Sequence, residues 1–153
     1  MKVSIIIPVF NEENTIIKIL KEVNNQVFED FSLEIIVIDD CSQDSTVDLL
    51  KENSSLYTKL IMLGTNLGKG GAVKQGILES TGEYILFQDA DLEYDPSDYK
   101  ILLKPFESPK ISAVYGSRVL NRNRYNNKNF TSNFRVFANH LLTIFSNLIN
   151  HQF

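Results

Sequence analysis

Short apolar runs alternate with segments of helical periodicity between residues 3 and 115, and this alternation limits the possible folds most strongly. The runs are rich in Ile, Val and Leu and have no polar face, which is typical of strands buried on both sides. We expect strands at 3–7, 33–38, 57–63, 84–87 and 111–115. Strand–helix alternation with short connections predicts an α/β fold, a Rossmann-like, mostly parallel sheet with helices on both faces.

Polar residues gather directly after each expected strand, in the clusters 8–13, 39–44, 66–71, 88–95 and 116–118. The carboxyl ends of parallel strands meet at one edge of a sheet, and ligands bind outside that edge. We therefore expect one ligand site built from these loops. Helix-start signals follow the same clusters: Asn14 or Thr15, Asp44 or Ser45, the glycines Gly68, Gly70 and Gly71, and Pro96, whose helix should run to about Phe106.

Asp89-Ala90-Asp91 is the sharpest chemical signal. Two carboxylates separated by one residue, just past an apolar strand, can place oxygens around one hard divalent cation. Mg²⁺ and Mn²⁺ favour such ligands and complete their shells with water and substrate phosphates. The alternative is a turn or a helix cap, which is the role expected of Asp95 before Pro96.

Three further features each leave two interpretations open. Asp40 is placed to bond a base or ribose, or else Asp40 and Ser42 organise the turn. The glycines in 66–71 cradle phosphate at a helix N-terminus or allow close helix–sheet packing. Arg118 binds a diphosphate with its planar fork or forms a surface ion pair.

Acidic and basic residues are segregated along the chain, whose formal net charge is −4. All 19 acidic residues lie at or before Glu107, whereas residues 108–153 contain only basic charges. This polarity predicts that the basic segment meets an anion such as a phosphate or a membrane surface, although it would also simply neutralise the acidic body. Nucleic acid is not an expected partner, because the basic segment lacks interleaved aromatic residues.

Several classes of protein are excluded by composition. The length of 153 residues suits one soluble domain. Cys41 is the only cysteine, which excludes a disulfide scaffold. No apolar run approaches the ~18 residues of a membrane helix, and Pro8, Asn11 and Glu12 interrupt any signal-peptide pattern. We expect a cytoplasmic protein.

Four ordered motifs together resemble glycosyltransferase family 2. They are Ile7–Glu12, Val37–Thr46, Asn66–Gly71 and Gln88–Leu92, and the resemblance runs from Met1 to about Leu120. Asp-Ala-Asp-Leu and Gly116-Ser117-Arg118 are most similar to the branch that includes dolichyl-phosphate mannosyltransferase and other polyprenyl-phosphate sugar transferases. The resemblance implies the GT-A fold and an inverting enzyme that transfers a sugar from a nucleotide-diphospho-sugar, a UDP- or GDP-sugar.

The resemblance also implies which residues form the site. The residues expected to contact the nucleotide-sugar are Pro8, Phe10 (where a tyrosine is common), Glu12, Ile38, Asp40, Asp89, Ala90, Asp91, Glu93 and Arg118. Asp89 and Asp91 would hold Mg²⁺ or Mn²⁺. Asp91 and Arg118 are the expected catalytic residues, because metal and arginine would stabilise the negative charge that develops on the departing diphosphate.

The acceptor side is expected to be incomplete. Residues 1–120 correspond to the nucleotide-sugar-binding core, and 121–153 to a polar basic loop with an amphipathic helix at 134–149. Members of the family continue further, so we expect a chain truncated at its C-terminus. The acceptor would be a polyprenyl phosphate or a cell-surface glycan, the purpose cell-envelope glycan synthesis. An ionised phosphate acceptor needs no catalytic base, and none is evident. The alternative function is a nucleotide-sugar-binding module without turnover.

The final helix at 134–149 leaves two interpretations open. It covers the sheet or a homodimer interface, or it lies on the cytoplasmic face of a membrane with nearby basic residues toward anionic headgroups. Those basic residues are Arg122, Arg124, Lys128 and Arg135.

Overall fold

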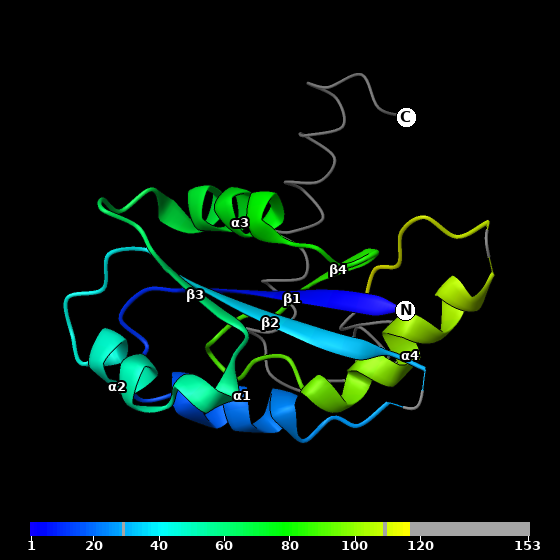
Figure 1. The fold of residues 1–153 in the computed structure, drawn as a ribbon, viewed down its shortest axis with the longest axis horizontal. Coiled ribbons are helices and arrows are strands. Elements are labelled where there is room, and N and C mark those ends of the chain that lie inside the picture. Colours follow the sequence, from blue (N-terminus) through cyan, green and yellow to red (C-terminus); the bar gives the residue numbers. More distant parts are fainter. Residues whose placement is uncertain (29, 109, 117–153) are drawn as a thin grey trace, which may run out of the picture. The chain divides into compact units, whose positions relative to one another are not determined.

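Four parallel strands form the sheet of this protein. The computed structural model describes residues 1–28, 30–108 and 110–116. Within them the strand order is β3-β2-β1-β4, and every neighbouring pair is parallel (Figure 1). The strands are β1 Lys2–Val9, β2 Ser32–Asp39, β3 Lys59–Met62 and β4 Tyr84–Phe87. The first four predicted strands are therefore confirmed.

Helices cover both faces of the sheet, as predicted. Figure 1 shows α3 (Gly68–Glu79) on one face and α1 (Ile16–Asn24), α2 (Thr46–Glu52) and α4 (Tyr99–Leu103) on the other. Short 3₁₀ turns lie at Ser54–Leu56, Pro96–Asp98 and Lys104–Glu107. Among the described residues, no helix has both the length and the apolar character needed to cross a membrane.

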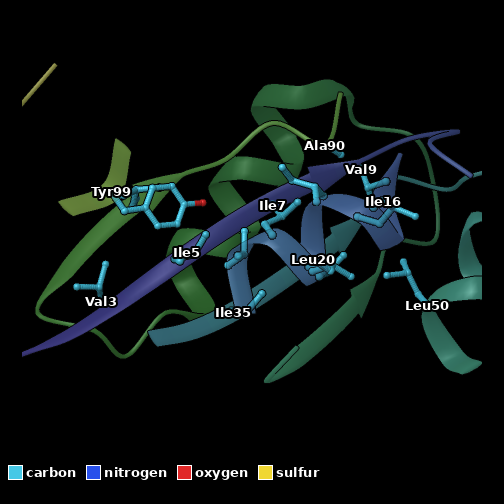
Figure 2. Close-up of a cluster of buried hydrophobic side chains, with 14 of the residues drawn as sticks. Val3, Ile5, Ile7, Val9, Ile16, Leu20, Ile35, Leu50, Ala90 and Tyr99 are labelled. Atoms are coloured by element: carbon cyan, nitrogen blue, oxygen red, sulfur yellow. The ribbon is translucent and has the colours of Figure 1, made fainter. Parts of the chain in front are cut away.

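The main core lies between the sheet and α1, α2 and α4. Alternate side chains of β1 enter it, and Figure 2 shows them packed against residues of the three helices. The labelled members are Val3, Ile5, Ile7, Val9, Ile16, Leu20, Ile35, Leu50, Ala90 and Tyr99. This alternation follows from strand geometry, because successive side chains point to opposite faces. Helix α1 buries its residues at three- and four-residue spacing for the equivalent reason.

The opposite face of the sheet packs closely against α3. Ile6, Ile36 and Ile38 lie beneath Ala72 in a smaller core. A Cβ added at Gly76 would lie 2.5 Å from Ile6 Cγ2, so this glycine sets the close approach. A Cβ at Gly68 or Gly70 would meet nothing within 4 Å. Close helix–sheet packing therefore depends on Gly76 and does not explain the glycines that open the helix.

The start of α2 confirms one of the predicted caps. Ser45 occupies the N-cap position, but the neighbouring carboxylate satisfies the helix, because Asp44 Oδ1 accepts a hydrogen bond from the Thr46 amide at 3.0 Å. Burial alone would raise the pKa of Asp44, and the hydrogen bonds from Thr46 and Glu13 outweigh burial and lower it.

Of two predictions about residues 96–115, the helix is wrong in part and the strand is wrong. The helix expected from Pro96 to about Phe106 forms as three short pieces, and α4 ends at Leu103 because Pro105 has no amide to donate to the preceding turn. Asp95 does cap its first turn, with Oδ1 accepting from the Ser97 amide at 2.8 Å, and this bond lowers the pKa of Asp95. Residues 111–116 form no strand, since a β-prone run becomes one only where another strand pairs with it.

The chain divides into two compact units, Met1–Ile111 and Ser112–Phe153. The expected boundary between 1–120 and 121–153 stays a prediction, because the residues on both sides of it lie outside the described ones. The same holds for Arg118, for the basic loop and for the amphipathic helix at 134–149. Membrane contact and dimer formation depend on those residues and also stay predictions.

Candidate functional site

A cavity of about 410 Å³ lies at the carboxyl edge of the sheet. Loops following all four strands contribute to it, as the positions of the polar clusters predicted. Its lining residues are Pro8, Val9, Phe10, Glu12, Asp40, Asn66, Gly68, Lys69, Ala72, Asp89, Ala90 and Asp91. Seven of the ten expected site residues are among them.

Strand register brings the two aspartates of the Asp-Ala-Asp motif beside the end of β1. Phe87, the last residue of β4, pairs with Ile6, whereas β1 continues to Val9. The chain after β4 therefore runs alongside the last residues of β1, and the Gln88 amide donates to the Ile6 carbonyl at 3.0 Å. This stagger places Asp89 and Asp91 in the same cavity wall as Pro8 and Phe10.

Gln88 fixes the loop that carries these aspartates. Its side chain is almost completely buried, and its Nε2 donates to the carbonyls of Asp89 at 3.0 Å and Tyr94 at 3.1 Å. The Tyr99 hydroxyl donates to Gln88 Oε1 at 2.7 Å. Burial raises the pKa of Tyr99, so its hydroxyl remains a donor. Figure 2 shows Tyr99 and Ala90 within the core, so the loop that carries Asp89 and Asp91 is anchored to the core.

Asp89 and Asp91 form a donor set that suits a hard divalent cation. Asp89 Oδ1 lies 2.6 Å from the ammonium of Lys69, so this carboxylate already pairs with a cation. Asp91 Oδ1 accepts from the Glu93 amide at 3.0 Å, and Asp91 is exposed to the cavity. No group of three or more His, Cys, Asp or Glu side chains suited to a metal occurs in the described part of the chain. Two carboxylates nevertheless fit Mg²⁺ or Mn²⁺, which take one or two from the protein and complete their shells with phosphate and water.

Asp40 connects the end of β2 to the start of α3. It is 3% exposed, and its Oδ1 accepts from the Leu67 amide at 2.7 Å. The turn after β2 is organised by its neighbour, because Asp39 Oδ2 accepts from the Ser42 amide at 3.1 Å. Asp39 Oδ1 is buried without a hydrogen-bond partner among the described residues. The turn-organising role therefore belongs to Asp39, and Asp40 faces the cavity.

The loop after β1 supplies an apolar wall and a carboxylate. Phe10 is 44% exposed at the cavity, and an exposed aromatic ring offers a flat surface to a planar ligand. Glu12 is held at both ends: its amide donates to Thr46 Oγ1 at 2.9 Å, and its Oε2 accepts from the Thr15 hydroxyl at 2.5 Å.

Left-handed backbone conformations gather at this edge. Asn11, Cys41 and Leu92 have φ of 56°, 67° and 62°, and Gly68 has φ of 73°. The first three lie in the loops after β1, β2 and β4, and Gly68 is the first residue of α3. A non-glycine residue in this region costs of order 1 kcal/mol or more, and such residues cluster at functional sites.

Three expected site residues do not line the cavity. Ile38 is fully buried in the smaller core. Glu93 is exposed and is not one of the lining residues. Arg118 lies outside the described residues. Ile38 and Asp40 have the same parity, but Ile38 lies inside β2 against α3, whereas Asp40 follows the last residue of the strand and reaches the cavity.

Lys69 and Asn66 line the cavity but were not among the expected site residues. The signal for Lys69 was its place inside the glycine cluster at the start of a helix. Nothing in the sequence pairs Lys69 with Asp89, which lies 20 positions along the chain on another loop.

A second cavity, of about 360 Å³, lies at the opposite end of the sheet. It is lined by Asn24, Gln26, Val27, Phe28, Phe31, Leu33, Ile35, Ser55, Tyr57 and Thr58. None of these side chains is charged, so the cavity at the carboxyl edge is the one with the chemistry of a metal or phosphate site.

Comparison with known proteins gives relatives that include named glycosyltransferases. A dolichyl-phosphate beta-glucosyltransferase of Trichomonas vaginalis is 31% identical over 157 residues, which cover 94% of this chain and 48% of the relative. The chain thus spans about half the length of this relative.

Solved structures of similar fold include two with bound nucleotide-sugars. The structure of S. aureus TarS 1-349 in complex with UDP-GlcNAc has a TM-score of 0.61 and 26% identity, covering 83% of this chain and 39% of that one. The mannosyltransferase PcManGT from Pyrobaculum calidifontis, in complex with GDP-Man and Mn²⁺, has a TM-score of 0.62 and 26% identity, covering 71% of this chain and 33% of the other.

The parallel sheet with helices on both faces agrees with the fold of these neighbours, which is the GT-A fold. The family model for glycosyl transferase family 2 matches residues 4–152. The resemblance seen in the four motifs is confirmed, and the chain belongs to glycosyl transferase family 2 with the GT-A fold.

Proposed function

We propose that this chain is the donor-binding part of an inverting, metal-dependent glycosyltransferase. Its cavity takes a nucleotide-diphospho-sugar, and the sugar passes to an acceptor that is a polyprenyl phosphate or a cell-surface glycan. The observation that carries the proposal is the convergence of Asp89 and Asp91 with Phe10 and Asp40 in one cavity at the carboxyl edge.

Different residues of the cavity are proposed to contact different parts of the donor. The exposed ring of Phe10 and the side chain of Pro8 provide a wall for the planar base, and Asp40 is placed beside it to accept a hydrogen bond. Asp89 and Asp91 would hold Mg²⁺ or Mn²⁺. When bound, this cation neutralises negative charge on the diphosphate leaving group.

The chemistry requires little else from the described residues. Arg118 is proposed to bind the diphosphate as a second positive group. The acceptor attacks the anomeric carbon from the face opposite the diphosphate, which inverts the configuration. A phosphate acceptor is already ionised and needs no base from the protein.

The relatives support both halves of the proposal. The curated relative acts, by its name, on dolichyl phosphate, which is a polyprenyl phosphate. The two structural neighbours hold UDP-GlcNAc and GDP-Man, the latter with Mn²⁺. A nucleotide-sugar-binding module without turnover is the competing function, since the chain spans about half of its relative.

Calorimetric titration tests the donor site. UDP and GDP are each titrated with Mn²⁺ and with EDTA into the wild type, into Asp91→Ala and into Asp48→Ala, a control carboxylate exposed on α2. We expect metal-dependent binding of one nucleotide, lost in Asp91→Ala and kept in Asp48→Ala. Failure of both nucleotides to bind would contradict the proposal.

Turnover separates the two candidate functions. The protein is incubated with Mn²⁺ and a nucleotide-sugar that contains whichever nucleotide binds, UDP or GDP. Each reaction is run with and without a short polyprenyl phosphate, and the released nucleoside diphosphate is measured. Release that rises with the acceptor indicates the enzyme. Binding without release indicates the binding module.

A further inference from the structure

The ion pair between Lys69 and Asp89 joins a helix start to the acidic loop. The Lys69 ammonium lies 2.6 Å from Asp89 Oδ1. The lysine side chain is 67% exposed and the aspartate side chain 23%, and both residues line the cavity. Because the lysine is on the solvent side and the carboxylate is held by the loop that Gln88 fixes, the lysine is the partner able to move.

The start of α3 makes a cation at Lys69 unfavourable unless an anion accompanies it. The N-terminus of a helix carries partial positive charge, which favours anions and disfavours lysine in the first turn. Lys69 lies in that turn, no acidic residue shares it, and Leu67 at the N-cap gives no side-chain hydrogen bond. Asp40 Oδ1 already accepts from the Leu67 amide at 2.7 Å at this helix end, so the carboxylate of Asp89 supplies the anion that Lys69 itself requires.

A metal on Asp89 would disturb this arrangement. A divalent cation bound by the carboxylate repels an ammonium only a few ångströms away, most strongly where solvent is partly excluded. Lys69 would then need a different anion. The diphosphate that arrives with the metal is such an anion, and Lys69 lies in the same cavity.

We propose that Lys69 is an exchangeable cation of the donor site. It pairs with Asp89 before the donor binds, and it passes to the diphosphate oxygens when Asp89 takes the metal. This inference rests on the proposed function, since it needs a diphosphate ligand and a metal at Asp89. It makes Lys69 both a competitor of the metal and a binding residue for the donor.

The two roles predict opposite effects of removing the charge. Without Lys69, Mn²⁺ alone should bind more tightly, because a competing cation has gone. The gain should be roughly two- to fivefold, the range for a partly exposed ion pair. The nucleoside diphosphate with Mn²⁺ should bind roughly tenfold more weakly, because a charged hydrogen bond to phosphate is lost.

The experiment compares Lys69→Gln with Lys74→Gln and Lys69→Arg. Lys74 is exposed on the same helix and does not line the cavity, so it controls for net charge near α3. Mn²⁺ without nucleotide is followed by the electron paramagnetic resonance signal of the free ion. UDP and GDP with Mn²⁺ are followed by calorimetry, and circular dichroism checks the fold of each variant.

The exchange is supported if Lys69→Gln binds Mn²⁺ more tightly and the nucleoside diphosphate more weakly. Both affinities should stay near wild type in Lys74→Gln and should recover in Lys69→Arg. Unchanged affinities, changes of one sign, or equal effects in Lys74→Gln overturn it. Absence of nucleotide binding in the wild type contradicts the proposed function instead, and the Mn²⁺ titration then still decides whether Lys69 competes with a cation at Asp89.

Discussion

The two ends of the sheet treat their acidic side chains differently. At the amino end, Glu34 of β2 is buried and surrounded by donors. At the carboxyl end, Asp39, Asp40, Asp89 and Asp91 have few protein donors, and most of them face a cavity. The donors at the amino end come from β1 and from the loop before β4, whereas the loops at the carboxyl end leave most of the carboxylates facing a cavity.

The amino end is a closed network. Glu34 accepts from the ammonium of Lys2 at 2.6 Å, from the Ser4 hydroxyl at 2.5 Å and from the Thr81 amide at 2.8 Å. The Thr81 hydroxyl bonds both Glu34 and Lys2, and Ser4 accepts from the Gly82 amide at 2.8 Å. Burial alone would raise the pKa of Glu34, but these hydrogen bonds outweigh it and lower the pKa to about 2.

The carboxyl end is left open. Asp39 Oδ1 has no partner within the described ranges, the four left-handed residues lie here, and Asp89 depends on an exposed lysine. Polar groups that satisfy one another stabilise the fold, whereas groups left with unused capacity remain available to a ligand. The amino end therefore contributes stability, and the carboxyl end is the part suited to binding.

Asp89→Ala should produce the largest effect, a loss of nucleotide binding with little change in stability. Metal-dependent nucleotide binding should weaken roughly 30-fold or more, because removing one partner of a desolvated charge contact costs about 2–5 kcal/mol. The free energy of unfolding should change by less than about 1 kcal/mol, since the ion pair with Lys69 is partly exposed. Calorimetry and urea denaturation measure the two quantities. If Asp89→Ala unfolded more easily but bound the nucleotide normally, the carboxyl end would contribute to stability and not to binding.

Acid should lower the free energy of unfolding by up to about 3 kcal/mol through the network at the amino end. The pKa of Glu34 falls from 4.5 to about 2 on folding, so the unfolded chain binds the extra proton between these values. This stability is complete above pH 4.5 and is lost as the pH falls toward 2. Urea denaturation across this range measures it, and Glu34→Gln isolates it, because the variant lacks the titrating group. Equal acid sensitivity of the two proteins would contradict the lowered pKa of Glu34.

Glu34→Gln at neutral pH should destabilise the fold by about 2 kcal/mol, because the charged hydrogen bonds become neutral and one amide donor faces other donors. Nucleotide affinity in the folded variant should stay within about twofold of wild type, the usual scale for a distant independent site. Denaturation and calorimetry on the same preparation test both statements. A large loss of affinity would show that the two ends are coupled.

Cys41→Gly should give the smallest effect, a gain of about 0.5 kcal/mol in the free energy of unfolding. Glycine relieves the left-handed strain at φ 67°, and part of that gain is offset by the greater freedom of the unfolded chain. Cys41→Ser keeps the strain and serves as the control. A loss of stability on substitution by glycine would mean that the conformation is not strained.

Sequence alone predicted the elements better than their contacts. The apolar runs located β1, β2, β3 and β4 within about two residues, because burial on both faces leaves an unbroken pattern. The run at 111–115 shows the limit, since β propensity does not reveal a pairing strand.

The residues of the candidate site that follow a strand were predicted from the sequence. The contacts between residues far apart in the sequence were not. Asp40, Asp89 and Asp91 line the cavity because each lies in a loop after a strand. The stagger of β4 against β1 and the pairing of Lys69 with Asp89 are long-range geometry that leaves no local pattern. Gly76 likewise looked like an ordinary helix residue, although it sets the distance between α3 and the sheet.

The bond from Tyr99 to Gln88 has a consequence for how quickly a donor is captured. It ties the acidic loop to the core, so the two carboxylates are in position as soon as the chain has folded. A site assembled during folding adds no conformational search to each binding event and lowers the entropy lost on association. Diffusion and electrostatic attraction, rather than loop rearrangement, should therefore set the association rate of the metal–nucleotide complex.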